Sequence, residues 1–137
     1  MRIKLAKFRL NRANEILKES EDSLKQKHFG LSVNRSYYAM FTAVRALLSL
    51  KEKDSSKHSG VIALFNQYIV KIGIFPKECS KFLRDAKKIR EEADYGDFVE
   101  ITEEDAKTQI KRAKKFIEEA EKTMQKMIEG DKSGQIK

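Results

Sequence analysis

The sequence predicts an all-α protein that folds as an antiparallel bundle of four to five helices. Apolar residues recur at the three- and four-residue spacing of a helix face over most of the chain. No stretch sustains the apolar–polar alternation of a strand, and one proline and six glycines leave long uninterrupted segments between them. A chain of 137 residues can bury a single core, so we expect one helical domain over residues 1–129 and a flexible tail over 130–137.

The first half of the chain predicts two long helices. Residues 5–27 place Leu5 and Phe8 on the same apolar-to-small face as later apolar residues, so both should point inward. Gly30 is the expected C-terminal cap of this helix, because glycine adopts the left-handed conformation that ends many helices. Residues 32–50 form the second helix, which is apolar apart from one polar stripe.

The second half predicts three more helices, over residues 58–72, 77–93 and 102–128. Ile72 is expected to face inward at the end of the first of these. Pro76 suits the start of the next helix, and residues 94–98 are typical of a turn. Thr102 and Asp105 have the spacing of a capping box, which satisfies free N–H groups at the start of the last helix.

Composition excludes several classes of site. A single cysteine, Cys79, allows no intrachain disulfide and no cysteine redox pair, and two histidines are too few for a familiar zinc site. No apolar run approaches the ~20 residues that span a bilayer, and the charged N-terminus lacks the apolar segment of a signal peptide. We therefore expect no cofactor, no metal and no membrane contact, and a cytoplasmic location.

The formal net charge is +8, which favours an anionic partner such as a nucleic acid, a nucleotide or an acidic protein. Lysines interleaved with glutamates at helical spacing are also typical of a solvated face. The same two interpretations apply to the basic run of residues 84–90, whose cations have Glu91 and Glu92 nearby in sequence.

The second helix carries the most informative pattern. Arg35, Tyr38, Thr42 and Arg45 are spaced so that they form one stripe on an otherwise apolar helix. Arginine is seldom buried without a partner, so the stripe should line a groove or a subunit interface. The pattern does not decide whether Tyr38 lies in the cleft or in the core. It also allows two roles for Arg45, as a phosphate ligand or as a member of an ion pair across subunits. Tyr37 is expected in the core.

Three short sequence motifs resemble those of the HEPN family, and the resemblance extends over residues 5–127. The motifs are R-S-Y-Y-A-M-F-T-A, K-H-S-G and E-A-D-Y. This family comprises small helical proteins that are often found beside minimal nucleotidyltransferases. The resemblance implies a helical bundle that dimerises. Many members are metal-independent ribonucleases in which an arginine is followed, after four to six residues, by a histidine, and two such helices meet across the dimer.

The resemblance transfers only part of that ribonuclease site. Arg35 matches the arginine of the family, and Ser36 is an acceptable polar neighbour. Thr42 stands where the resemblance implies the histidine, and a threonine hydroxyl is not a general base near neutral pH. His58, at the start of the third predicted helix, is the candidate to replace it. The alternative for His58 is a structural residue at a helix start.

Three functions follow as hypotheses. The first is a nucleotide- or RNA-binding partner of a minimal nucleotidyltransferase, in a toxin–antitoxin-type module, with little or no catalysis. Its expected binding residues are Arg35, Ser36, Tyr38, Thr42, Arg45 and His58. The second is a ribonuclease toxin in which Arg35 acts with His58. The third is a structural homodimer whose stripe serves only the interface. We favour the first, because the expected general base is missing at Thr42.

Overall fold

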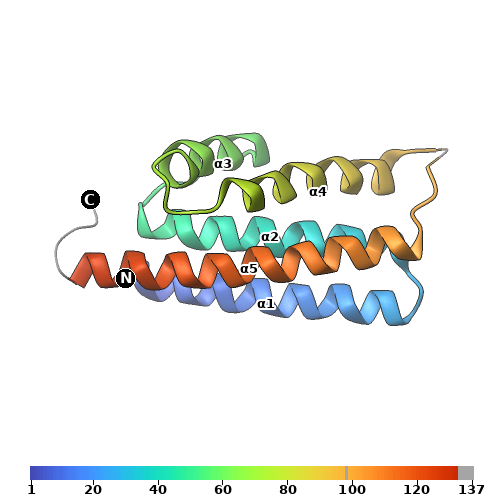
Figure 1. The fold of residues 1–137 in the computed structure, drawn as a ribbon, viewed down its shortest axis with the longest axis horizontal. Helices are drawn as coiled ribbons and strands as arrows, with labels where there is room; N and C mark the ends of the chain where they lie inside the picture. The colour runs from blue at the N-terminus through green and yellow to red at the C-terminus, as the bar shows by residue number, and fades with distance from the viewer. Residues whose placement is uncertain (98, 133–137) are drawn as a thin grey trace.

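The computed structural model of the chain describes residues 1–97 and 99–132. Within them every regular element is a helix, which confirms the predicted all-α fold class. The elements are α1 (Arg2–Lys25), α2 (Phe29–Leu50), α3 (His58–Phe65), the π-helical turn η1 (Asn66–Val70), α4 (Lys77–Tyr95) and α5 (Glu103–Lys132). Figure 1 shows α1, α2 and α5 as three long rods side by side, with α3 and α4 covering the other side of α2.

Helix α2 is the centre of the bundle, since α1, α4 and α5 all pack against it. Small residues allow α1 to approach α2 closely: Ala6, Ala13 and Ser20 are fully buried on α1. The larger side chains fill the space between α2, α3, α4 and α5. They include Tyr37, Met40, Leu47, Phe65, Leu83 and Phe116, each at most 1% exposed.

The inward position predicted for Leu5 and Phe8 is wrong. Leu5 is 43% exposed and Phe8 is 70% exposed. Helix α1 packs on α2 through its alanine side instead, because small residues permit a closer and better-packed contact there. Two apolar side chains are therefore left on the outer edge of α1.

The turn between α1 and α2 also differs from the prediction, because Gly30 is not the cap. Lys27 takes the left-handed conformation, with a φ of 62°. The His28 N–H donates to the Ser23 carbonyl over 2.9 Å, which closes the end of α1. Helix α2 consequently begins at Phe29, and Gly30 lies in its first turn.

The third predicted helix is divided in the structure. Helix α3 ends at Phe65 and continues as the π-turn, in which the Lys71 N–H donates to the Asn66 carbonyl, five residues back, over 2.8 Å. A turn follows in which Gly73 has a φ of 86°. Ile72 lies in this turn and is 55% exposed, so its predicted inward position is wrong.

The start of α5 confirms the capping box. The Thr102 N–H donates to the Asp105 carboxylate over 3.0 Å, and the Asp105 N–H donates to the Thr102 hydroxyl over 3.1 Å. Helix α5 ends at Lys132 and α4 at Tyr95, so both run further than predicted. Residues 133–137 of the predicted tail and Phe98 of the predicted turn lie outside the described residues. No described helix is long and apolar enough to cross a membrane.

Candidate functional site

Two polar stripes lie side by side on the outer surface of α1 and α2. The stripe on α2 is the predicted one. The stripe on α1 has the same spacing and consists of Arg9, Arg12, Ile16 and Glu19. The two helices are antiparallel, so Arg9 lies near Arg45, and Glu19 lies near Arg35. Packing thus brings arginines from two helices onto one surface.

A hollow of about 340 Å³ lies between these stripes. Three arginines line it, one of which comes from α2 (Arg9, Arg12 and Arg45). Four rings also line it, those of Phe8, Tyr38, Phe41 and His58, together with Ile16 and Thr42. The hollow combines guanidinium groups, which bind phosphate, with flat rings on which a base can stack.

One end of the hollow is held by an ion cluster. Arg45 donates to the Asp54 carboxylate over 3.0 Å, and Arg9 lies 4.0 Å from the same carboxylate. Arg9 also donates to the Ser49 hydroxyl over 2.8 Å. Burial would raise the pKa of Asp54, but hydrogen bonds from Arg45 and the Ser55 N–H outweigh it and lower that pKa. Arg45 therefore has an ion-pair partner within its own chain.

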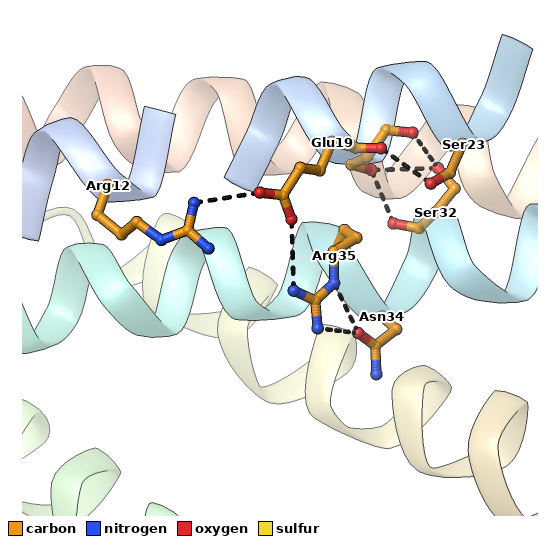
Figure 2. A network of polar contacts seen from close by, with 7 residues as sticks. Arg12, Glu19, Ser23, Ser32, Asn34 and Arg35 are labelled. Atoms are coloured by element: carbon orange, nitrogen blue, oxygen red, sulfur yellow. Dashed lines mark hydrogen bonds and ion pairs between the residues drawn. The ribbon is translucent and has the colours of Figure 1, made fainter. Parts of the chain in front are cut away.

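The other end is organised by Glu19, as Figure 2 shows. The Glu19 carboxylate accepts from Arg12 over 3.1 Å and from Arg35 over 3.5 Å. Arg35 also donates to the Asn34 side chain over 2.7 Å and lies over the Tyr38 ring, 5.2 Å from its centre. Both guanidinium groups are thereby fixed in place beside the hollow.

Ser36 does not reach this surface. It is fully buried, and its hydroxyl lies 2.7 Å from the Ser20 hydroxyl. Ser20 also donates to the Ser32 carbonyl over 2.7 Å, so the three serines form a small polar cluster between α1 and α2. We therefore remove Ser36 from the candidate binding residues.

His58 enters the hollow from the start of α3. Its ring is tilted by 33° against the Phe41 ring with 4.3 Å between centres, and its Nδ1 lies 3.4 Å from the Tyr37 hydroxyl. Burial lowers the pKa of His58, and the positive charges of Arg90, Lys87 and Arg45 lower it further. The imidazole is therefore neutral near pH 7.

Tyr37 and Arg90 lie behind this histidine. Burial raises the pKa of Tyr37 to about 12, so the phenol keeps its proton. The Arg90 guanidinium lies over the Tyr37 and Tyr38 rings, 5.0 and 5.7 Å from their centres, and pairs with Asp94 at 3.5 Å. Arg90 is only 8% exposed, so it is packed against the rings behind the hollow and does not belong to a solvated face.

The structure thus brings four of the six predicted residues, Tyr38, Thr42, Arg45 and His58, around one hollow. Arg35 lies at its edge, linked through the Tyr38 ring and Glu19. Sequence reasoning missed Arg9 and Arg12. Their spacing with Ile16 and Glu19 matches the stripe on α2, and this match was the available signal.

Comparison with known proteins supports the family that the sequence motifs indicate. The family model described as the HEPN domain matches residues 6–123. The chain belongs to the HEPN family. A UPF0332 protein of Thermotoga maritima is 40% identical over 122 residues, covering 89% of this chain and 92% of that protein.

Two similar proteins of Methanocaldococcus jannaschii carry a toxin in their names. "Putative toxin MJ0142" is 31% identical over 130 residues, covering 89% of this chain and 88% of its own length. "Putative toxin MJ0605" is 30% identical over 116 residues, covering 85% of this chain and 86% of its own length. These relatives cover most of this chain, and the HEPN model, which matches residues 6–123, includes every residue that lines the hollow.

Proposed function

We propose that this HEPN protein binds RNA or a nucleotide in the hollow between α1 and α2. The observation that carries the proposal is the meeting of three arginines and four rings at one hollow. With Arg35 at the edge, four guanidinium groups face two carboxylates, Glu19 and Asp54, which leaves an excess of two positive charges. Arginine binds phosphate through paired N–H groups, and the rings accept a base.

Binding is proposed with little or no cleavage. Thr42 occupies the wall of the hollow at the place where the family resemblance implies a histidine. Its hydroxyl can donate a hydrogen bond to a phosphate but cannot take a proton from a ribose hydroxyl near neutral pH. The hollow therefore offers charge and stacking without a general base on α2.

The biological setting that we propose is a toxin–antitoxin-type module, in which a minimal nucleotidyltransferase is the partner. The toxin names of two relatives support this setting. This setting predicts that a small nucleotidyltransferase is encoded beside this gene, and co-expression of the two should give a complex that survives size-exclusion chromatography. Separate elution of the two proteins at tens of micromolar would contradict the partnership.

A second candidate function is a metal-independent ribonuclease that uses Arg35 and His58. The observation in its favour is the neutral His58 ring at the hollow, with Tyr38 in ring contact with His58 and beneath Arg35. A neutral imidazole has a lone pair that can accept a proton. Cleavage of RNA by the wild-type protein that disappears in His58→Ala would favour this function over simple binding.

We also propose a homodimer whose two-fold axis passes near the polar stripe of α2. Phe8 supports this arrangement, since it is 70% exposed and lines the hollow. A large apolar side chain beside a basic hollow is suited to contact a second copy of the chain. Sedimentation should show a dimer for the wild type and a monomer for Phe8→Glu. A wild-type monomer at tens of micromolar would count against the dimer.

The direct test of binding compares two arginines in similar surroundings. Arg35 pairs with Glu19 at 3.5 Å and lies 5.2 Å from the Tyr38 ring centre, whereas Arg112 pairs with Asp85 at 3.6 Å and lies 5.3 Å from the Phe82 ring centre. Arg35→Ala should weaken binding of a fluorescent single-stranded RNA, and Arg112→Ala should change it little. Equal losses would reduce the hollow to a generic basic surface.

A further inference from the structure

A groove distinct from the first hollow runs between α3–η1 and α4. Two hollows, of about 620 and 240 Å³, share Asn66, Ser80 and Arg84 in their walls and so form one continuous groove. It extends from Lys71 and Lys77 at one end to Ser59 and Lys87 at the other. We refer to it as the α3–α4 groove.

The charge of the α3–α4 groove is of one sign. In the part of the chain that the structure describes, its walls carry five cations and no acidic side chain; the cations are Lys71, Lys77, Lys81, Arg84 and Lys87. Of these five cations, only Lys87 has an ion pair within the described residues, with Glu91 at 3.9 Å. Unpaired cations that face one groove attract a polyanion, because no internal carboxylate competes for them.

The hollows along α5 provide the contrast, although they too contain many cations. There, Lys107 pairs with Glu103 at 3.2 Å, Lys114 with Glu21 at 3.2 Å, and Lys115 with Glu119 at 3.1 Å. Most cations of these α5 hollows are thus neutralised by neighbouring carboxylates, and Lys111 is the exception among the described residues. The α3–α4 groove and the α5 hollows are both rich in cations, and they differ in how many of these cations form ion pairs with carboxylates.

The α3–α4 groove continues towards the first hollow. Ser59 lines the groove, and His58, the preceding residue, lines the first hollow. Lys87 of the groove and Arg45 of the hollow both act on the His58 ring, where each lowers its pKa. The positive surface therefore passes over the start of α3 from one hollow to the other.

The two hollows differ in chemistry. Among the described residues, no aromatic ring lines the α3–α4 groove. Its polar groups are the amides of Asn66 and Gln67, the hydroxyls of Ser59 and Ser80, and the five cations. Such a lining suits phosphates and riboses, whereas the rings of the first hollow suit bases. From Lys77 to Lys87, α4 presents cations over roughly 15 Å of its length, which is longer than a single nucleotide requires.

We infer that the α3–α4 groove binds the sugar–phosphate backbone of a single-stranded RNA whose bases occupy the first hollow. The inference rests on the proposed function of that hollow and extends it, because it selects an RNA strand over a free nucleotide. An acidic protein could also be attracted to five cations. The continuity with a ring-lined hollow favours RNA.

The test removes two charges from the groove and, as a control, two charges from α5. Lys77→Ala/Arg84→Ala and Lys107→Ala/Lys114→Ala each remove two exposed helical cations seven residues apart, so both lower the net charge equally. Binding of a labelled trinucleotide and of an RNA of about 12 nucleotides is measured against salt concentration. Circular dichroism confirms the fold of each variant.

The groove variant should bind the longer RNA more weakly. The logarithm of the binding constant falls with the logarithm of the salt concentration, with a slope of about −0.7 per phosphate contact for a single strand. Loss of two contacts should therefore make this slope shallower by about 1.4. This corresponds to a loss of about 25-fold at 0.1 M salt, if the affinities converge near 1 M. Trinucleotide binding should stay unchanged, and the α5 variant should retain most of its affinity for both probes.

Three results would overturn the inference. Unchanged binding of the longer RNA by the groove variant, with a loss in Arg35→Ala, would leave the first hollow as a binding site and remove the groove from the path. Equal losses in the groove and α5 variants would show only a net-charge effect. Binding of poly-glutamate that depends on Lys77 and Arg84, with RNA binding unaffected, would assign the groove to an acidic protein. Wild-type protein that binds neither RNA would refute the proposed function itself.

Discussion

Glu19 is the carboxylate that competes with a phosphate for the arginines of the first hollow. It accepts from Arg12 over 3.1 Å and from Arg35 over 3.5 Å, and its side chain is 43% exposed. Exposed ion pairs of this kind contribute about 0–1 kcal/mol to stability. Glu19→Gln should therefore remove one negative charge and release both arginines with little effect on the fold.

The expected gain in RNA affinity follows from Coulomb's law. A phosphate bound by Arg12 or Arg35 would lie roughly 5–6 Å from the Glu19 carboxylate, since both share the same guanidinium groups. At an effective dielectric constant between about 40 and 80, the repulsion of two unit charges at that distance is about 1 kcal/mol. Its removal should tighten binding about fivefold.

The assay is fluorescence anisotropy with a labelled single-stranded RNA at about 0.1 M salt, where charges this close are only partly screened. Glu118→Gln is the matched control, because Glu118 pairs with Lys122 at 3.6 Å on α5 and its loss raises the net charge equally. Tighter binding by Glu19→Gln alone is expected. The reasoning is refuted if Glu19→Gln binds no more tightly than the wild type, or if Glu118→Gln gains as much.

Three further predictions concern catalysis, protonation and stability. Thr42→His should create or raise RNA cleavage in a gel assay, because a general base contributes about 10²–10⁴-fold, and adding Arg35→Ala should abolish the gain. NMR titration should give His58 a pKa below its ordinary 6.5. The free energy of unfolding should fall as the pH drops from 6.5 through the lower pKa of folded His58, because the unfolded chain binds the proton first, and His58→Gln should remove this pH dependence. Lys27→Gly should raise the free energy of unfolding by about 0.5–1 kcal/mol in denaturant titration, because Lys27 has a φ of 62°, and a loss of stability would contradict that strain.

Local chemistry explains which helix ends were predictable. Thr102 and Asp105 form a capping box from two residues three apart, so the sequence contains the whole interaction. The end of α1 depends on Lys27 adopting a conformation that lysine rarely takes, and nothing in its side chain indicates this. Gly30 attracted the prediction because glycine is the common residue at such a position.

The candidate site was predictable to the extent that it lies on one helix. Tyr38, Thr42 and Arg45 share a stripe of α2, and helical spacing alone places them together. Arg9 and Arg12 join them only because α1 packs antiparallel on α2, which is a tertiary fact. Ser36 was misplaced because a small hydroxyl serves equally in a binding site and in close helix packing, and only the Ser20 contact decides between them.

Whether His58 can act as a base on RNA depends on which group donates the proton in its contact with Tyr37. The pKa of Tyr37 is about 12, so its phenol remains a donor at neutral pH, and its hydroxyl lies 3.4 Å from Nδ1 of His58. If the phenol donates to Nδ1, the ring of a neutral His58 carries its own proton on Nε2 and offers no free lone pair as a base. In that tautomer His58 can donate to a phosphate but cannot activate a ribose hydroxyl. Tyr37→Phe removes the donor and frees the Nδ1 lone pair of that tautomer, so cleavage that rises in this variant would show that the hydroxyl holds His58 in a binding role.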